Sequence, residues 1–247
     1  MAGAPARYLV FFQYFGTRYS GVMETKSDQA LVGVQNYLEK AAEQLKPSAP
    51  IKFHISSRTD SGVHALANAA HLDIQRAPGR APFTGPQLLQ GLNHHLKPEP
   101  IRILSAQRVS STFHARFCAL SRTYIYRLLL GCAHRSQIPV FEQDLCWAPP
   151  GGGLEFWEVK VKSKSFLYRQ VRRMVGALVA VGQGRLAPGR LQELLELREP
   201  RALPPHATAP PQGLFLHSVE YSHTDLAPPS APAEEELCGL SRKEFIT

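Results

Sequence analysis

The sequence predicts an α+β fold in which helices flank a mixed or antiparallel sheet. Three observations favour this class. Strand-like and helix-like segments interleave along the 247 residues, several consecutive strands lie close enough to pair as hairpins, and 44% of the residues are apolar. The short connections favour antiparallel neighbours over a doubly wound parallel sheet. The apolar content suffices for a packed core and excludes wholesale disorder.

The first half begins with Arg7–Phe15, which is rich in aromatic and β-branched residues and predicts a buried strand. A helix follows, because apolar residues recur at steps of three and four until two prolines end the pattern. Its apolar stripe is Leu31, Val34, Leu38, Ala42 and Leu45. The other elements expected here are strands at Ile51–Ile55, Ala69–Ile74 and Ile101–Val109, and a helix at Gln87–Leu96.

The second half is predicted to contain three strands and two helices. Alternating side chains indicate strands at Arg122–Leu130 and Glu155–Lys162, and the last strand is Leu214–Tyr221. The strongest helix is expected at Phe166–Val181 and a short leucine-rich helix at Leu191–Leu197. The residues expected on the buried side of the stronger helix are Val171, Met174, Val175, Leu178 and Val179.

One segment carries the whole net charge of +8. Between Lys160 and Arg190 there are eight basic residues and no acid, so the rest of the chain sums to zero. A neutral body with one basic segment is typical of a protein that binds a polyanion, most often nucleic acid. A solvated basic surface without a partner is the alternative.

Cysteine usage and hydropathy restrict the class further. The four cysteines are scattered without a C-x-x-C pair, which argues against a zinc ribbon or a disulfide scaffold and suggests an intracellular protein. No apolar run approaches the length of a membrane span. The first acid is Glu24, which is compatible with mitochondrial import. The cytosol or the nucleus is the alternative, since a cleaved leader would remove part of the Arg7–Phe15 strand.

The segment Ser57-Arg58-Thr59-Asp60-Ser61-Gly62-Val63-His64-Ala65 carries the most unusual chemistry. It places one carboxylate between a guanidinium, two hydroxyls and a glycine turn, directly after a predicted strand. A neighbouring arginine keeps an aspartate ionised, which suits a nucleophile or an electrostatic stabiliser. An aspartate turn that only satisfies its own backbone is the alternative.

Other candidate sites are weaker. His94-His95 has no third ligand at a suitable spacing, so surface histidines are expected rather than a metal site. Ser56, Asp60 and His64 do not form a hydrolase triad, because no G-x-S-x-G surrounds either serine. The absence of phosphate-binding glycine motifs leaves nucleotide cofactors unsupported. Tyr124 could stack on a base, although a core role suits this residue type equally well.

Together these segments resemble the TruA-type tRNA pseudouridine synthases. Residues 58–65 resemble the family signature R-T-D-x-G-V-H-A, and residues 113–117 resemble F-H-A-R-F. Residues 122–126 are similar to the tyrosine strand that follows it, residues 166–176 to the helix F-x-x-x-M-V-R-x-I-V-G, and residues 209–214 to the closing turn A-P-x-x-G-L. The five elements occur in the family's order between Arg7 and Tyr221.

The resemblance implies a fold and a mechanism. The fold is two similar α/β halves whose sheets join around a basic cleft, and the family commonly forms homodimers. Asp60 would be the nucleophile that promotes cleavage of the uridine N1–C1′ bond, after which the base rejoins through C5. Tyr124 would stack on the target base, Arg172 would pair with the catalytic carboxylate, and Arg58 would help to hold the flipped nucleotide. No cofactor or metal is implied.

The partner implied by the resemblance is tRNA. Basic side chains would hold its phosphates, which position the substrate without reading its sequence. The residues expected at the RNA backbone are Lys160, Lys164, Arg169 and Arg173. No membrane partner is expected.

The chain departs from the family pattern in its second half. The family has a further helix and strand between the Tyr124 strand and the Trp157 strand, whereas only Leu145–Gly153 connects them here. We therefore expect halves at 7–110 and 111–222, the second shortened near 145–153, and a flexible tail at 223–247. The gap predicts lower stability and weak or absent catalysis.

Two other functions are considered beside tRNA isomerisation. An RNA-binding protein of the same fold would lack turnover because of the missing segment. A phosphotransferase using Asp60 is the third possibility, but that class usually places a second acid two residues further on, where this chain has Gly62.

Overall fold

The computed structural model describes residues 4–26, 28–132, 134–151, 153–199 and 207–228. Within these residues the chain forms a mixed α+β fold around one seven-stranded sheet, which confirms the predicted class. The strand order is β4-β1-β3-β7-β5-β6, and β2 pairs with β3 beside this path. None of the helices in this part of the chain is both long and apolar enough to cross a membrane.

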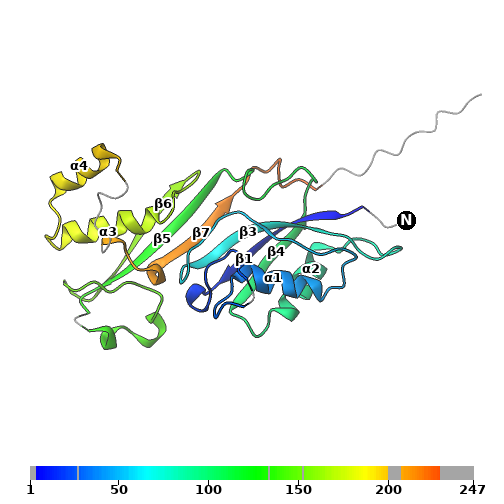
Figure 1. Cartoon of the computed structure of the whole chain (residues 1–247), viewed down its shortest axis with the longest axis horizontal. Helices are drawn as coiled ribbons and strands as arrows, with labels where there is room; N and C mark the ends of the chain where they lie inside the picture. Colours follow the sequence, from blue (N-terminus) through cyan, green and yellow to red (C-terminus); the bar gives the residue numbers. More distant parts are fainter. Residues whose placement is uncertain (1–3, 27, 133, 152, 200–206, 229–247) are drawn as a thin grey trace, which may run out of the picture.

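The first half supplies one end of the sheet. Its strands are β1 (Ala6–Tyr14), β2 (His54–Ile55), β3 (His64–Ile74) and β4 (Ile101–Arg108), and its helices are α1 (Val34–Glu43) and α2 (Gly85–His95). β1 pairs antiparallel with both β3 and β4. Figure 1 shows α1 and α2 together at this end of the sheet. Buried side chains of the first half, between Ala6 and Val109, form most of the core.

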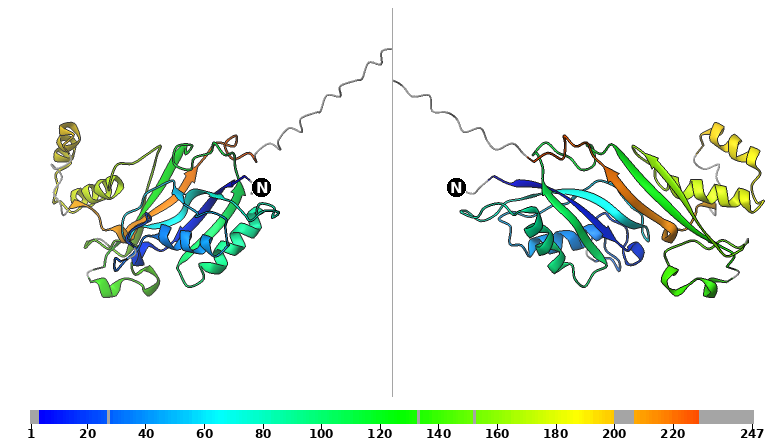
Figure 2. Two further views of the ribbon diagram at one scale, coloured as in Figure 1. Left: turned by 45° about the vertical axis from the view of Figure 1, so that its right-hand side comes forward. Right: turned by 180° about the vertical axis from the view of Figure 1, so that it is seen from behind.

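The second half supplies the other end. Its strands are β5 (Ser121–Leu130), β6 (Glu155–Ser163) and β7 (Leu214–Glu220), and its helices are α3 (Gln170–Gly182) and α4 (Pro188–Leu197). β5 lies between β6 and β7 and is antiparallel to both. Both views in Figure 2 place α3 and α4 at this end, far from α1 and α2.

The two ends meet through a short parallel contact between β3 and β7. Only His64 with Phe215 and Ala65 with Leu216 are paired there. These residues directly follow the segment that contains Asp60. The predicted boundaries at 7–110 and 111–222 fall between β4 and β5, and the predicted tail 223–247 lies outside the described residues from position 229 onward.

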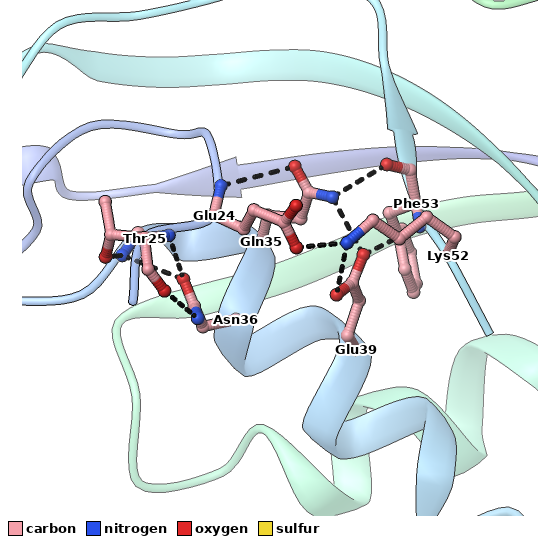
Figure 3. A network of polar contacts seen from close by, with 8 residues as sticks. Glu24, Thr25, Gln35, Asn36, Glu39, Lys52 and Phe53 are labelled. Atoms are coloured by element: carbon pink, nitrogen blue, oxygen red, sulfur yellow. Dashed lines mark hydrogen bonds and ion pairs between the residues drawn. The ribbon is translucent and has the colours of Figure 1, made fainter. Parts of the chain in front are cut away.

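A polar network fixes α1 against the strand that leads to the motif (Figure 3). The buried Gln35 side chain donates to the carbonyl oxygen of Phe53 at 3.0 Å and to the Glu39 carboxylate at 2.8 Å. Lys52 bridges the carboxylates of Glu24 and Glu39. Because residues 52 and 53 lie just before β2, the network holds the entry to the loop at Ser56–Asp60.

Several predicted boundaries are wrong. The strand expected at Ala69–Ile74 begins five residues earlier, at His64, and the strand expected at Ile51–Ile55 is only His54–Ile55. The helix expected from Phe166 begins at Gln170, because Arg169 adopts a left-handed conformation with φ of 56° and the Gln170 side chain accepts from the backbone N–H of Leu167.

The buried side of α3 is also narrower than expected. Val171 and Val175 are buried, whereas Met174 is 42% and Leu178 is 51% exposed. Both residues lie on the stripe for which the spacing predicted burial. The shortening of the second half stays a prediction.

Candidate active site

Asp60 lies in a tightly held loop between β2 and β3. The backbone forms a turn in which Val63 N–H donates to the Asp60 carbonyl at 3.1 Å, and Gly62 has φ of 76°, a conformation that favours glycine. Thr59 is fixed by its hydroxyl, which lies 2.7 Å from the phenol oxygen of buried Tyr14. An isolated bridge to Gly21 anchors Asp60 itself. The carboxylate position is therefore set by backbone rather than by a mobile loop.

Two arginines lie beside the same carboxylate oxygen. Arg172 donates from Nη1 to Oδ2 of Asp60 at 3.3 Å, and Arg169 Nε lies 3.8 Å from that oxygen. Arg172 is buried and its Nε also donates to the Ala209 carbonyl at 2.8 Å, which fixes the guanidinium. Two guanidinium groups from the second half of the chain therefore lie beside the Asp60 carboxylate.

The ring of Tyr124 lies in the same cleft as Asp60. It comes from β5, is only 8% exposed, and packs edge to face against Phe166 with ring centroids 5.2 Å apart. Burial raises the pKa of Tyr124 to about 12, an effect that Arg122 opposes and the Asp60 charge reinforces. The phenol therefore stays protonated at neutral pH and offers a fixed neutral ring for stacking.

Arg122 joins the segments that build the cleft, a role that the sequence analysis missed. Its buried guanidinium donates to the backbone carbonyls of Ser56, Arg116 and Lys164 and to two serine hydroxyls. Burial lowers the pKa of Arg122. Strand alternation could have revealed it, since Arg122 is two residues from Tyr124 and shares its face.

These residues line a cleft of about 630 Å³ with a basic rim. Among the described residues that line it, Asp60 is the only acid, and the cations are Arg58, Arg116, Arg122, Lys164 and Arg169. Phe117 and Tyr168 add exposed aromatic rings, and the Arg169 guanidinium lies 4.8 Å from the centroid of the Tyr168 ring. Such a combination suits a single-stranded nucleotide segment, with cations for phosphates and rings for bases.

The structure places the eight predicted site residues in two groups. Asp60, Tyr124, Arg58, Lys164 and Arg169 line the cleft, and Arg172 reaches Asp60 from α3. Lys160 and Arg173 are not among the residues that line it. Arg58 and Lys164 are exposed, so both present their charge to solvent.

His64 and a cluster of three other histidines lie outside the residues that line the cleft. His64 is fully buried, its Nδ1 accepts from the Gly16 N–H, and its Nε2 lies 2.9 Å from the Asp144 carbonyl oxygen. Both ring nitrogens are therefore engaged by backbone groups, in agreement with the rejection of a triad.

His54, His71 and His114 lie close together, with one ring nitrogen of each within 4.8 Å of the others. The Nδ1 atoms of His71 and His114 already accept backbone N–H groups of Ala115 and Arg116. The neutral rings then carry their protons on Nε2, which leaves neither ring with a lone pair for a metal. The donor set does not fit a metal site in this arrangement. Among the described residues, His94 and His95 belong to no such group.

Comparison with known proteins identifies the class of protein. The sequence family described as tRNA pseudouridine synthase matches residues 10–118 and 133–222, which is most of the chain. The chain belongs to this family, whose members are isomerases that act on RNA, and it is of the TruA type.

Individual relatives agree with this assignment. The chain is 48% identical to a protein named tRNA pseudouridine synthase-like 1 from Xenopus laevis, over 92% of this chain and 95% of the relative. It is 43% identical to the protein of the same name from Homo sapiens, over 92% of this chain and 96% of the relative. It is 33% identical to tRNA pseudouridine synthase A from Paramagnetospirillum magneticum, over 87% and 95%.

This chain is shorter than the stretch over which it aligns with the Xenopus laevis relative. The Xenopus laevis match extends over 283 positions, whereas 92% of this 247-residue chain is about 227 residues. About 56 positions of the match therefore have no counterpart in this chain. That these positions are missing from the second half, near residues 145–153, stays a prediction.

Proposed function

We propose that this protein isomerises uridine to pseudouridine in tRNA, with Asp60 as the nucleophile. One observation carries the proposal. Asp60 is the only carboxylate among the described residues lining a cleft that is otherwise basic, and two arginines lie within 3.8 Å of one of its oxygens. A carboxylate that lies beside two guanidinium groups in a basic cleft is suited to nucleophilic attack.

The proposed reaction is an isomerisation in which all atoms are conserved. The Asp60 carboxylate attacks C1′ of the target uridine, and the electron pair of the N1–C1′ bond leaves with the uracil. The base rotates in the cleft, and C5 attacks C1′ and displaces the carboxylate. Loss of the proton on C5 and protonation of N1 complete pseudouridine. The sequence involves no oxidant, reductant or cofactor.

The substrate residues have distinct roles in the proposal. Tyr124 stacks on the flipped base, which offsets part of the few kcal/mol that unstacking costs. Arg58 and Lys164, both exposed at the rim, bind phosphates beside the target nucleotide. Lys160 and Arg173 lie outside the cleft lining, so any contact they make is with RNA beyond the target nucleotide.

Isotope-labelled or unmodified tRNA transcripts, incubated with the full chain, test the proposal. Pseudouridine is measured by nucleoside mass spectrometry and RNA affinity by filter binding. Asp60→Asn keeps the size of the side chain but removes the nucleophilic charge. We expect isomerisation to fall by at least about 10³-fold, as when nucleophiles are removed from other covalent catalysts, with nearly unchanged affinity. Retained turnover in this variant would exclude Asp60 as the nucleophile.

A second function is supported by the difference in length from the Xenopus laevis relative. An RNA-binding protein with little turnover would keep the basic cleft but lose activity because about 56 positions present in the Xenopus laevis relative are missing. The same assay distinguishes the two functions when this chain and that relative are compared side by side. Binding without pseudouridine in this chain, beside turnover by the longer protein, would favour the second function.

A further inference from the structure

Two exposed aromatic rings stand at the rim of the cleft. Phe117 is 72% and Tyr168 is 65% exposed, and both line the cleft that contains Asp60. Leu167, the neighbour of Tyr168 in sequence, is 79% exposed and lines the same cleft. Single exposed apolar side chains are ordinary on a protein surface, but three of them around one basic cleft indicate a surface that contacts a ligand.

Each of the two rings is accompanied by an arginine that is its neighbour in sequence. The Arg116 guanidinium lies 5.9 Å from the centroid of the Phe117 ring, and the Arg169 guanidinium lies 4.8 Å from that of Tyr168. A ring offers a stacking surface for a base, and a guanidinium offers charge and hydrogen-bond donors for a phosphate. Each aromatic–arginine pair therefore has the two kinds of contact that bind one nucleotide.

Arg122 joins the two loops that carry these rings. Its guanidinium donates at 2.8 Å to the carbonyl oxygen of Arg116, the residue before Phe117. It also donates at 2.6 Å to the carbonyl oxygen of Lys164, in the loop that leads to Tyr168. Because one buried side chain fixes both loops, a base that stacks on either ring does not first have to order a loop, and this lowers the free-energy cost of binding.

The Tyr168 ring lies close to the proposed nucleophile. Arg169 connects the two, because its Nε is 3.8 Å from Asp60 Oδ2 and its guanidinium lies against the Tyr168 ring. Arg169 also has the left-handed backbone, with φ of 56°, that is uncommon outside glycine and is concentrated at binding sites. In the proposed function the buried Tyr124 takes the target base, which leaves the exposed Tyr168 for a neighbouring nucleotide.

We propose that Phe117 and Tyr168 form a stacking subsite for the nucleotides that flank the target uridine, one ring to each base. The inference rests on the proposed function for the identity of the central nucleotide and extends it to that nucleotide's neighbours. Arg116 and Arg169 contact the phosphates of these neighbours. Because every base has a π face, the subsite accepts any flanking base but requires that the base be unpaired.

The affinity of the full chain for two short RNA probes tests the subsite without requiring turnover. One probe is a single-stranded RNA with one uridine between adenosines, and the other has the same phosphates and uridine but abasic flanking riboses. We expect Phe117→Ala and Tyr168→Ala each to weaken binding of the first probe by about fivefold or more, the effect of one lost base–aromatic stack. Binding of the abasic probe should not change, because it has no flanking base to lose.

Three controls separate stacking from other effects. Tyr168→Phe keeps the ring and loses only the hydroxyl, so it should bind the first probe as tightly as the wild type. Phe141→Ala removes a ring that is 90% exposed but is not among the described residues lining the cleft, so it should bind normally. The slope of log affinity against log salt should be the same in Tyr168→Ala as in the wild type, because no phosphate contact is removed.

The subsite and the proposed function fail on different results. Unchanged affinity of both alanine variants for the first probe would overturn the subsite even if the chain forms pseudouridine. An equal loss of affinity for both probes would also overturn it, since the rings would then act without the flanking bases. Affinity that depends on both ring and flanking base, with no pseudouridine formed in tRNA, would support the subsite and overturn the isomerase function.

Discussion

Arg172 donates to Asp60 across 112 residues of sequence, joining α3 of the second half to the motif loop of the first. The distance between Arg172 Nη1 and Asp60 Oδ2 is 3.3 Å, and Arg172 is held from behind by the Ala209 carbonyl. The Asp60 carboxylate therefore takes its charge partner from the other end of the sheet.

Replacing Arg172 by alanine should reduce turnover more than RNA affinity. The change removes the principal charge partner of Asp60 and leaves only the longer contact with Arg169. We expect kcat to fall by about 10²–10³-fold, the usual effect of removing one electrostatic group from an active site, with a small change in affinity. Single-turnover kinetics and filter binding measure the two effects. Arg173→Ala, the next position on α3, is the matched control, and an equal loss there would show that α3 is only a charged surface.

Replacing Lys164 by alanine should weaken RNA binding and leave the chemical step nearly intact. Lys164 lines the cleft and is exposed, and a single phosphate contact contributes about one unit or less to the slope of log affinity against log salt. Binding measured at several salt concentrations gives the slope. The sequence also predicted a contact for Lys160, and from its place outside the cleft we expect a smaller effect. Exposed Lys97 on the α2 side provides the control.

Replacing Arg122 by alanine should destabilise the protein and disorder the cleft together. Three backbone carbonyls from separate segments would lose a charged donor in a buried setting. Leaving buried acceptors unsatisfied should lower the free energy of unfolding by at least about 2 kcal/mol. Urea denaturation measures the loss. Arg122→Lys keeps the charge without the planar fork, so partial rescue is expected, and full stability of the alanine variant would contradict the role.

The protein should lose stability on acidification below about pH 6.5. Burial lowers the pKa of His71 to about 3, and the nearby His54 and Arg7 add to the effect. The groups that face His71 are His54, His114, Arg7 and Asp73. Because the unfolded state binds this proton first, stability is full above pH 6.5 and falls toward pH 3. The free energy of unfolding should change by less than ~1.4 kcal/mol per pH unit, which is the limit for one proton. Solvent screening weakens the electrostatic interactions of His71 and keeps the change below this limit.

His71→Gln isolates this effect. Glutamine can still accept the Ala115 N–H but does not titrate, so the difference in unfolding free energy between pH 7 and pH 5 should be smaller than in the wild type. Urea titrations at the two pH values measure it. An unchanged pH dependence would assign the acid sensitivity to other groups.

The sequence predicted more of the site than of its scaffold. Asp60, Tyr124 and Arg58 lie in local motifs whose residue types constrain each other, and all three line one cleft. The start of α3 was missed because the left-handed backbone of Arg169 depends on tertiary contacts rather than on helix propensity. The exposure of Met174 and Leu178 was missed for a different reason. Their spacing indicates a buried stripe, but spacing says nothing of whether a partner element is present to cover it.

The sequence also did not predict the role of Arg122 in joining the segments around the cleft. Arginine is rarely buried, so residue type alone assigns Arg122 to the surface, and only its alternation with Tyr124 along the strand indicates otherwise. Its five hydrogen bonds arise because three loops converge on one point, and that convergence is a property of the three-dimensional arrangement alone.

The two-residue contact between β3 and β7 makes the strand pairing between the two ends of the sheet short beside the proposed catalytic centre. Among the described strands, only His64 with Phe215 and Ala65 with Leu216 pair across this seam. Asp60 stands on one side of this seam, and Tyr124 and Arg172 stand on the other. A fluctuation that parts the seam would separate Asp60, the proposed nucleophile, from Tyr124, the proposed stacking platform, while each end keeps its own strands and helices. A tRNA bound across the cleft would act as a second tether, so substrate itself would hold the working geometry together.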